Sequence, residues 1–240
     1  MNAYIIRIDD HKGQRESAQK LTSSIVKTGS VIQPVFFSAT IPDTISEHLY
    51  SEFNYFKHSQ YKWNYPTTPS QNHLDMATGL YKKSYSASDP KRVEACLISH
   101  MRLWDKCVTD DEPMLILEAD AIFVEPFDEN KLDGSPIIGL NSPRGATRRA
   151  AIFDKQVSQC KGVQPVPTVN TPDEEPTPQG IAGNSAYYIT PQGAKTLLDL
   201  VTLYGGWPND AIMCKELIPN LRVIYPYFTR VQGTQSTTTG

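Results

Sequence analysis

Two carboxylates, Glu118 and Asp120, follow an apolar run in the segment MLILEADAIF, residues 114–123. If residues 114–117 form a buried strand, the acids lie just past its carboxyl end, and alternation along the chain directs both the same way. Two carboxylates on one side repel each other unless a cation lies near them. Oxygen ligands suit Mg²⁺ or Mn²⁺, and such a cation can bridge to a diphosphate. The alternative is an exposed strand end with two solvated acids, and on the pair alone this is the simpler interpretation.

The elements before this pair predict an α/β fold. Residues 3–8 are apolar like a buried strand, residues 14–28 have helical spacing ended by Gly29, and residues 31–39 read as a second strand. Pro34 places that second strand at an edge or a bend. This order is typical of a parallel α/β unit, in which ligands bind at the carboxyl ends of the strands.

The elements after residue 41 are less uniform. Residues 41–90 are aromatic and polar, which predicts either a loop-rich excursion packing its rings on the domain or a sugar- or base-stacking surface. Packing is the simpler interpretation.

The remaining predicted elements are helices and strands in alternation. They are a helix over 90–108, strands over 136–140, 181–190 and 222–228, a helix from Thr190-Pro191 to Gly205, and a short helix over 211–218. Residues 142–180 show little periodicity, and their Pro-rich part is expected to be a lid or a passive loop.

The charge balance argues against a protein that depends on nucleic-acid phosphates. The 240 residues include 23 basic and 26 acidic side chains, a net charge of −3. Arg144, Arg148 and Arg149 could form a local anion site or could simply be exposed on a loop. There is no apolar run near the roughly 20 residues that span a bilayer, and the start of the sequence does not resemble a signal peptide. We therefore expect a cytoplasmic protein.

Four cysteines occur at positions 96, 107, 160 and 214. No pair has Cys-x-x-Cys spacing, so a zinc site is not expected. Cys96 lies within an apolar helical pattern and fits a small core residue. Reduced thiols are expected throughout.

Four segments in order carry a resemblance to a known family: ACLISHMRLW, MLILEADAIF, GNSAYYITPQGAKTLL and PNDAI. Together they resemble glycosyltransferase family 25, which includes lipopolysaccharide β-galactosyltransferases and collagen galactosyltransferases. The resemblance implies a GT-A type fold, a Rossmann-like mixed sheet flanked by helices. It implies one glycosyltransferase domain over 1–240, with a nucleotide-sugar half (1–140), an acceptor-side half (141–240) and a mobile Pro-rich loop (162–180).

The same resemblance implies a reaction and a set of roles. A hexose would pass from a nucleotide-diphosphate sugar, expected to be a UDP-sugar, to an acceptor hydroxyl with inversion, helped by Mn²⁺ or Mg²⁺. Asp120 and Glu118 would hold the metal, and Asp210 would be the base that takes the acceptor proton. On this view the donor-binding residues are Arg7, Asp9, Arg15, Glu118 and Asp120, and the acceptor-side residues are Asn184, Ser185, Gln232 and Ser236.

Several alternatives stay open at this point. Asp210 sits at a predicted helix start, where the helix dipole would keep its carboxylate ionised, and it could be only a helix cap. His100 lies mid-helix beside core residues and is interpreted as a structural, hydrogen-bonding histidine. Ala119 replaces the middle acid of the family's Glu-Asp-Asp, which motivates a catalytically degenerate binding protein as an alternative function. A nucleotidyltransferase is a further alternative. The acceptor is expected to be a glycan, as in lipopolysaccharide biosynthesis, with a protein or modified nucleobase hydroxyl as alternatives.

Overall fold

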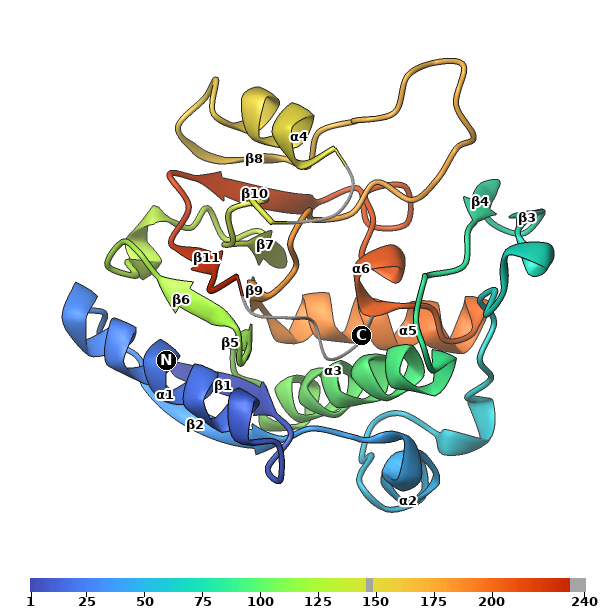
Figure 1. The fold of residues 1–240 in the computed structure, drawn as a ribbon, viewed down its shortest axis with the longest axis horizontal. Helices are drawn as coiled ribbons and strands as arrows, with labels where there is room; N and C mark the ends of the chain where they lie inside the picture. Colours follow the sequence, from blue (N-terminus) through green and yellow to red (C-terminus); the bar gives the residue numbers. More distant parts are fainter. Residues whose placement is uncertain (146–148, 234–240) are drawn as a thin grey trace.

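A mixed sheet of seven strands organises the molecule (Figure 1). The computed structural model describes residues 1–145 and 149–233. The strand order is β2-β1-β5-β9-β7-β10-β8. The strands are β1 Asn2–Arg7, β2 Gln33–Ser38, β5 Met114–Glu118, β7 Ile137–Gly139, β8 Gly162–Pro165, β9 Ala186–Ile189 and β10 Leu221–Tyr225. Two further pairs lie outside this sheet, β3 His73–Asp75 with β4 Leu80–Lys82, and β6 Ala121–Phe123 with β11 Thr229–Val231.

The direction of the strands changes at β9. Strands β2, β1 and β5 are mutually parallel, whereas β9 runs antiparallel to both β5 and β7. Beyond it, β10 is parallel to β7 and antiparallel to β8. The carboxyl end of β5 therefore lies next to the start of β9, which brings residues from both halves of the chain to one edge.

The helices begin and end at residues that the sequence marks for that purpose. Gly29 ends the first helix in the left-handed conformation, with a φ of 73°. The side chain of Asp89 caps the third helix, and that of Thr190 caps the fifth by accepting from the backbone N–H of Gly193. The helices are α1 Lys12–Thr28, α2 Ile45–Ser51, α3 Pro90–Asp110, α4 Ala150–Val157, α5 Pro191–Tyr204 and α6 Asn209–Ile212.

Alternation along β5 divides the core into two layers. Leu115 and Leu117 pack in the same apolar cluster as Leu21 of α1, whereas Met114 and Ile116 pack in the cluster that contains α3 and α5. In Figure 1, α1 accordingly lies beside β1 and β6, while α3 and α5 run together on the other side. The next even position after Ile116 is residue 118, so the strand directs that side chain toward α3.

Most of the predicted elements are confirmed, including the edge position of β2 with its Pro34. The prediction was wrong for residues 142–180, because α4 forms there and β8 pairs with β10. The helix expected over 211–218 is shorter and ends at Ile212. Eight-residue and four-residue elements carry too little periodicity to be recognised from their own sequence.

The aromatic segment between β2 and α3 packs on the domain, which was the simpler of its two interpretations. Phe56 and Tyr65 are buried. The carboxylate of Asp105, buried on α3, accepts hydrogen bonds from the backbone N–H groups of residues 54, 55 and 56 at 2.7–2.8 Å. This anchor holds the segment against the helix that carries part of the site described below.

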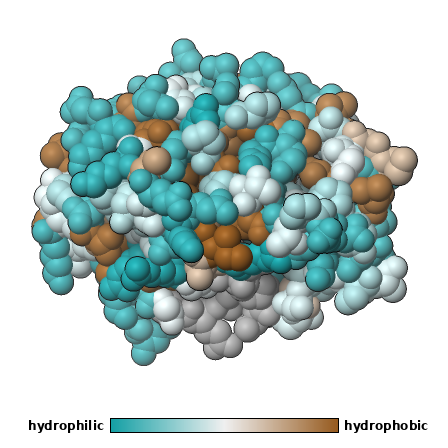
Figure 2. Space-filling view, turned by 90° about the horizontal axis from the view of Figure 1, so that it is seen from above, coloured by the Kyte–Doolittle hydropathy of each residue, from teal (hydrophilic) through white to brown (hydrophobic). Residues whose placement is uncertain are grey.

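The described surface is mainly hydrophilic on the face shown in Figure 2, where hydrophobic residues lie in separate patches. In the ranges that the structure covers, no helix combines the length and the apolar character that crossing a membrane requires. All four cysteines are present as thiols.

Candidate active site

The acids at the end of β5 meet at one hydroxyl group. The backbone N–H of Glu118 donates to the Ser185 carbonyl at 2.8 Å, which fixes the start of β9 beside the end of β5. The Ser185 hydroxyl donates to Glu118 Oε2 at 3.4 Å, and the same hydroxyl lowers the pKa of the nearby Asp120 carboxylate. The two carboxylates therefore face the same place, as alternation predicts.

The surroundings of Asp120 disfavour its negative charge. Burial, followed by the charge of Glu118, raises the pKa of Asp120 from its ordinary 3.8 to about 6, although the Ser185 hydroxyl opposes the shift. Its Oδ1 atom is buried and has no hydrogen-bond partner among the described residues. A buried carboxylate oxygen beside a second carboxylate fits a hard divalent cation such as Mg²⁺ or Mn²⁺.

Residue 119 points away from this place. Ala119 is buried in the apolar cluster that contains α1, the layer opposite Glu118. An alanine at residue 119 therefore does not change the side to which Glu118 and Asp120 are directed.

Gln232 clamps the turn that carries the acids. Its backbone N–H donates to the Asp120 carbonyl at 2.8 Å, and its side-chain amide lies 2.9–3.2 Å from the carbonyls of Ala119, Ala121 and Ser17. This places Gln232 against the turn that carries the two acids, and the Ser185 hydroxyl lies beside Glu118 of the same turn. Ser236, which was predicted with it, lies outside the described residues.

A buried series of hydrogen-bonding side chains on α3 and β9 ends at Glu118. The Trp104 indole N–H donates to the Tyr187 hydroxyl at 2.8 Å, and that hydroxyl lies 2.8 Å from His100 Nδ1. Since an indole N–H can only donate, the Tyr187 hydroxyl accepts from Trp104 and keeps its own hydrogen and a second lone pair for His100 Nδ1. Nε2 lies 3.4 Å from Glu118 Oε1. The prediction of a hydrogen-bonding, core histidine is confirmed, and its contact with Glu118 adds a role that the sequence did not indicate.

Asp210 is the second residue of α6 and is held by Tyr85, whose hydroxyl donates to Oδ1 at 2.7 Å. The N-cap position of α6 is Pro208, so Asp210 is not the cap residue. The pKa of Asp210 is raised, mainly by burial and then by the charge of Glu118, while Tyr85 and His100 oppose the shift. A helix start alone would lower this pKa, but burial near another acid outweighs the effect of a four-residue helix and shifts the pKa the other way.

Three of the residues expected to bind the donor lie together after the carboxyl end of β1. Ile6 is the partner of Glu118 in the parallel register of β1 and β5, so the residues after Ile6 lie at the same sheet edge as the acids. Arg7 Nε lies 3.0 Å from Asp9 Oδ1, and Arg15 donates to the Asp9 carbonyl. This edge thus carries two arginines near the acidic turn.

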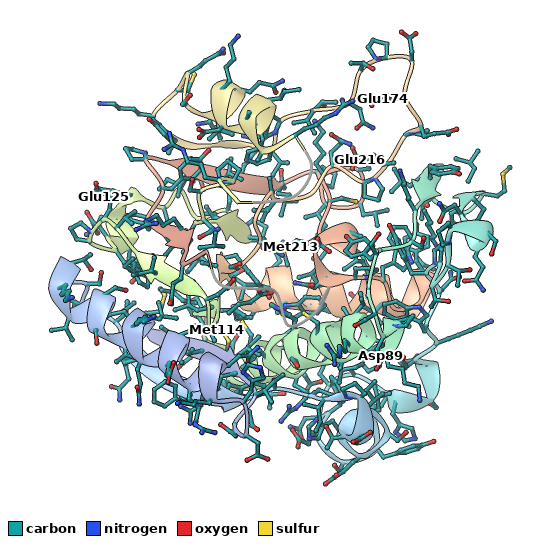
Figure 3. The ribbon with its side chains drawn as sticks, viewed as in Figure 1. Asp89, Met114, Glu125, Glu174, Met213 and Glu216 are labelled. Atoms are coloured by element: carbon teal, nitrogen blue, oxygen red, sulfur yellow. The ribbon has the colours of Figure 1, made fainter. Side chains whose placement is uncertain are left out.

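Unsatisfied polar atoms concentrate at this site. Asn184 is buried, and its Nδ2 lies 3.6 Å from the sulfur of Met213, the residue labelled near the middle of Figure 3. Five buried side-chain atoms in the described ranges lack a hydrogen-bond partner, and four of them belong to His100, Asp120, Asn184 and Gln232. Because a buried polar group without a partner is costly, their concentration indicates a place that binds a ligand.

Two of the three arginines considered as an anion site each lie beside an acidic side chain. Arg144 lies 3.6 Å from the Asp154 carboxylate. Arg149 pairs with Glu174, which Figure 3 places on the outer loop after β8. Arg148 lies outside the described residues. Two of the three are thus engaged by acids within the chain.

Two residues of the site were missed from the sequence. Tyr85, in the aromatic segment, gave no signal that it would reach Asp210. Cys96 was interpreted as core, yet it is only partly buried, and its sulfur lies near His100 and Glu118. The proximity of Cys96 to His100 could have been predicted, because residues four apart share one face of a helix.

Comparison with known proteins adds a family to this geometry. Residues 1–135, more than half of the chain, match the model described as "Glycosyltransferase family 25 (LPS biosynthesis protein)". Among solved structures, mouse xyloside xylosyltransferase 1 in its apo form is similar with 9% sequence identity and a TM-score of 0.43, covering 92% of this chain and 84% of that one. A similarity this distant does not bear on donor or acceptor. No curated protein matches the sequence.

Proposed function

Because the chain belongs to glycosyltransferase family 25, we propose that it moves a hexose from a UDP-sugar to an acceptor hydroxyl, with inversion at the sugar carbon and with a divalent cation. The observation that carries this proposal is the meeting of Glu118 and Asp120 at the Ser185 hydroxyl, with a buried and unpartnered oxygen on Asp120. Two acids that repel each other at the end of a parallel strand suit a cation bound to a diphosphate.

Glu118 and Asp120 are the residues that would hold Mn²⁺ or Mg²⁺. When bound, the cation would neutralise charge on the departing nucleoside diphosphate. Arg7 and Arg15 at the neighbouring strand end would attract the same phosphates. In this proposal residues 1–140 bind the donor, and Ala119 takes no part because its side chain lies in the opposite layer.

Asp210 is proposed as the base. The acceptor oxygen forms the new bond to the sugar carbon, the bond to the diphosphate breaks, and the acceptor proton passes to the Asp210 carboxylate. A raised pKa makes this carboxylate a better proton acceptor as long as it is ionised. The hydrogen bond from Tyr85 fixes Oδ1, which leaves Oδ2 for the acceptor hydroxyl.

The acceptor side is proposed to include Asn184 and Ser185 from residues 141–240. Asn184 has a buried, unpartnered Oδ1 that could accept a hydrogen bond from a hydroxyl group. A glycan presents many such hydroxyls, so a glycan is the proposed acceptor, consistent with the lipopolysaccharide-biosynthesis description of the family.

The test is to incubate the purified protein with a panel of nucleotide sugars and Mn²⁺, with and without glycan acceptors, and to identify the released nucleotide. Release of UDP that increases with a glycan supports the proposal. Release of pyrophosphate would instead indicate a nucleotidyltransferase. If no donor is hydrolysed and calorimetry detects no nucleotide binding, the protein is a degenerate relative and the proposal fails.

Gly180 offers a test of the position of Asp210. A Cβ atom at residue 180 would lie 2.3 Å from the Asp210 carbonyl oxygen and 3.0 Å from that of Met213, so Gly180→Ala must displace α6. Because misplacement of a catalytic group by about 1 Å can cost roughly 100-fold, we expect kcat to fall about 10- to 100-fold with little change in donor affinity.

Steady-state kinetics and donor titration measure this prediction. Gln192→Ala on the exposed side of α5 is the control and should behave as the parent protein. A normal kcat in Gly180→Ala would mean that the position of α6 does not matter for transfer.

A further inference from the structure

We propose that Cys96, His100 and Glu118 form a second cation site, one that takes a divalent ion of the zinc class rather than Mn²⁺ or Mg²⁺. The Cys96 sulfur, a His100 ring nitrogen and a Glu118 oxygen all lie within 4.8 Å of one another. Cysteine, histidine and one carboxylate form a ligand set that suits Zn²⁺ or Co²⁺, whereas Mg²⁺ and Mn²⁺ prefer oxygen ligands.

The fold prepares the first two ligands. Cys96 and His100 are one helical turn apart on α3, a 21-residue helix whose inner face is buried. Spacing of this kind places two ligand atoms on one side of a helix without any loop rearrangement. The third ligand comes from the end of β5, in the central part of the sheet, so all three stand on regular elements.

The second, independent observation is the state of His100. Its Nε2 atom is buried, aims at Glu118 and has no well-formed hydrogen bond in the described part of the chain. Its other nitrogen lies 2.8 Å from the Tyr187 hydroxyl. A metal-bound histidine commonly donates its second ring N–H to such a partner, which fixes the ring.

Binding of the ion requires a change in the protons of Cys96 and His100, and both changes can be accounted for. On binding, the Cys96 thiol releases its proton to solvent. His100 binds as the tautomer with hydrogen on Nδ1, which Tyr187 can accept because a hydroxyl oxygen has two lone pairs. The Cys96 sulfur now lies 3.7 Å from Asn209 Oδ1, a weak contact that the metal would replace.

The proposed site is accessible from solvent through Glu118, and it leaves one coordination position of the ion free. The His100 side chain is 1% exposed, but that of Glu118 is 34% exposed. Three protein ligands leave the fourth position of a tetrahedral ion for water. The cation would therefore enter from the side of the proposed donor site.

The two proposed cation sites share Glu118. If the zinc-class ion draws Glu118 toward α3, that carboxylate is no longer available beside Asp120, and zinc should inhibit transfer supported by Mn²⁺. This consequence rests on the proposed function, whereas binding of the ion to Cys96, His100 and Glu118 does not.

Cobalt titration of the reduced, metal-free full chain tests binding directly. We expect a thiolate-to-cobalt charge-transfer band together with visible bands of a tetrahedral ion. Cys96→Ser should abolish the charge-transfer band and weaken Zn²⁺ binding at least tenfold by calorimetry. His100→Gln should weaken binding to a similar degree, and circular dichroism verifies the fold of each variant. Cys160→Ser removes an exposed cysteine far along the chain and should change nothing.

Either of two results would overturn the site: no charge-transfer band in the parent protein, or a band that persists in Cys96→Ser. Because neither measurement needs a sugar donor, a protein that binds cobalt as expected but hydrolyses no donor refutes the proposed function alone. Zinc inhibition that is equally strong in the parent and in Cys96→Ser would refute the competition for Glu118.

Discussion

Asp210→Asn is expected to lower kcat by about 10²- to 10⁴-fold, the range that a positioned base contributes. Asparagine keeps the size of the side chain and can still accept the hydrogen bond from Tyr85, so the local geometry should survive. It cannot take a proton from the acceptor hydroxyl. Binding of the nucleotide sugar should stay within about twofold, because Asp210 belongs to the half of the chain proposed to bind the acceptor.

Single-turnover kinetics and donor titration separate these two effects. Asp199→Asn, a change of the same kind on the exposed face of α5, is the matched control. In the parent protein, kcat should fall as the pH drops through the pKa of Asp210, and the raised pKa moves that loss to higher pH than an ordinary aspartate would show. Near-normal turnover in Asp210→Asn would remove this residue as the base.

Asp120→Asn is expected to stabilise the metal-free protein at neutral pH. The folded-state pKa of about 6 exceeds the ordinary 3.8, so ionised Asp120 destabilises the fold. The penalty is complete above pH 6 and disappears as the pH falls toward 4, where the folded protein binds the proton more tightly than the unfolded chain. At about 1.4 kcal/mol per pKa unit, the gain at pH 7.5 is at most about 3 kcal/mol.

Urea unfolding in the presence of a chelator, at pH values between 4 and 7.5, measures this difference. Added Mn²⁺ should then stabilise the parent protein and leave Asp120→Asn unchanged, which is the signature of a ligand. Asp173→Asn, an exposed aspartate on the loop after β8, is the control and should follow the parent throughout. Equal stabilisation of parent and Asp120→Asn by Mn²⁺ would show that the cation binds elsewhere.

The sequence predicted the placement of the acids after β5 better than the placement of the other candidate residues. Strand alternation and the parallel order of β1 and β5 are local rules, and they correctly directed Glu118 and Asp120 to one side and Ala119 to the other. The length and capping of α3 and α5 were likewise readable, because both helices carry a clear apolar period and a capping residue.

The other half of the site depends on contacts between residues far apart in the chain. Tyr85 and Asp210 are separated by 125 positions, and nothing in either neighbourhood indicates the other. The raised pKa of Asp210 was missed for the same reason, since it arises from tertiary burial and from the charge of Glu118. Local reasoning considered only the helix start and therefore predicted the opposite sign.

The hydrogen bonds of Gln232 also mean that the turn with the two acids is completed late in synthesis. During synthesis, the acids of the β5 turn and the first helix emerge more than a hundred residues before the side chain that ties Ser17, Ala119 and Ala121 together. A nascent chain can thus have its parallel strands paired while the acidic turn still lacks this tie. A chain that stopped before residue 232 would contain every strand of the main sheet but would lack the hydrogen bonds that hold the turn of Glu118 and Asp120.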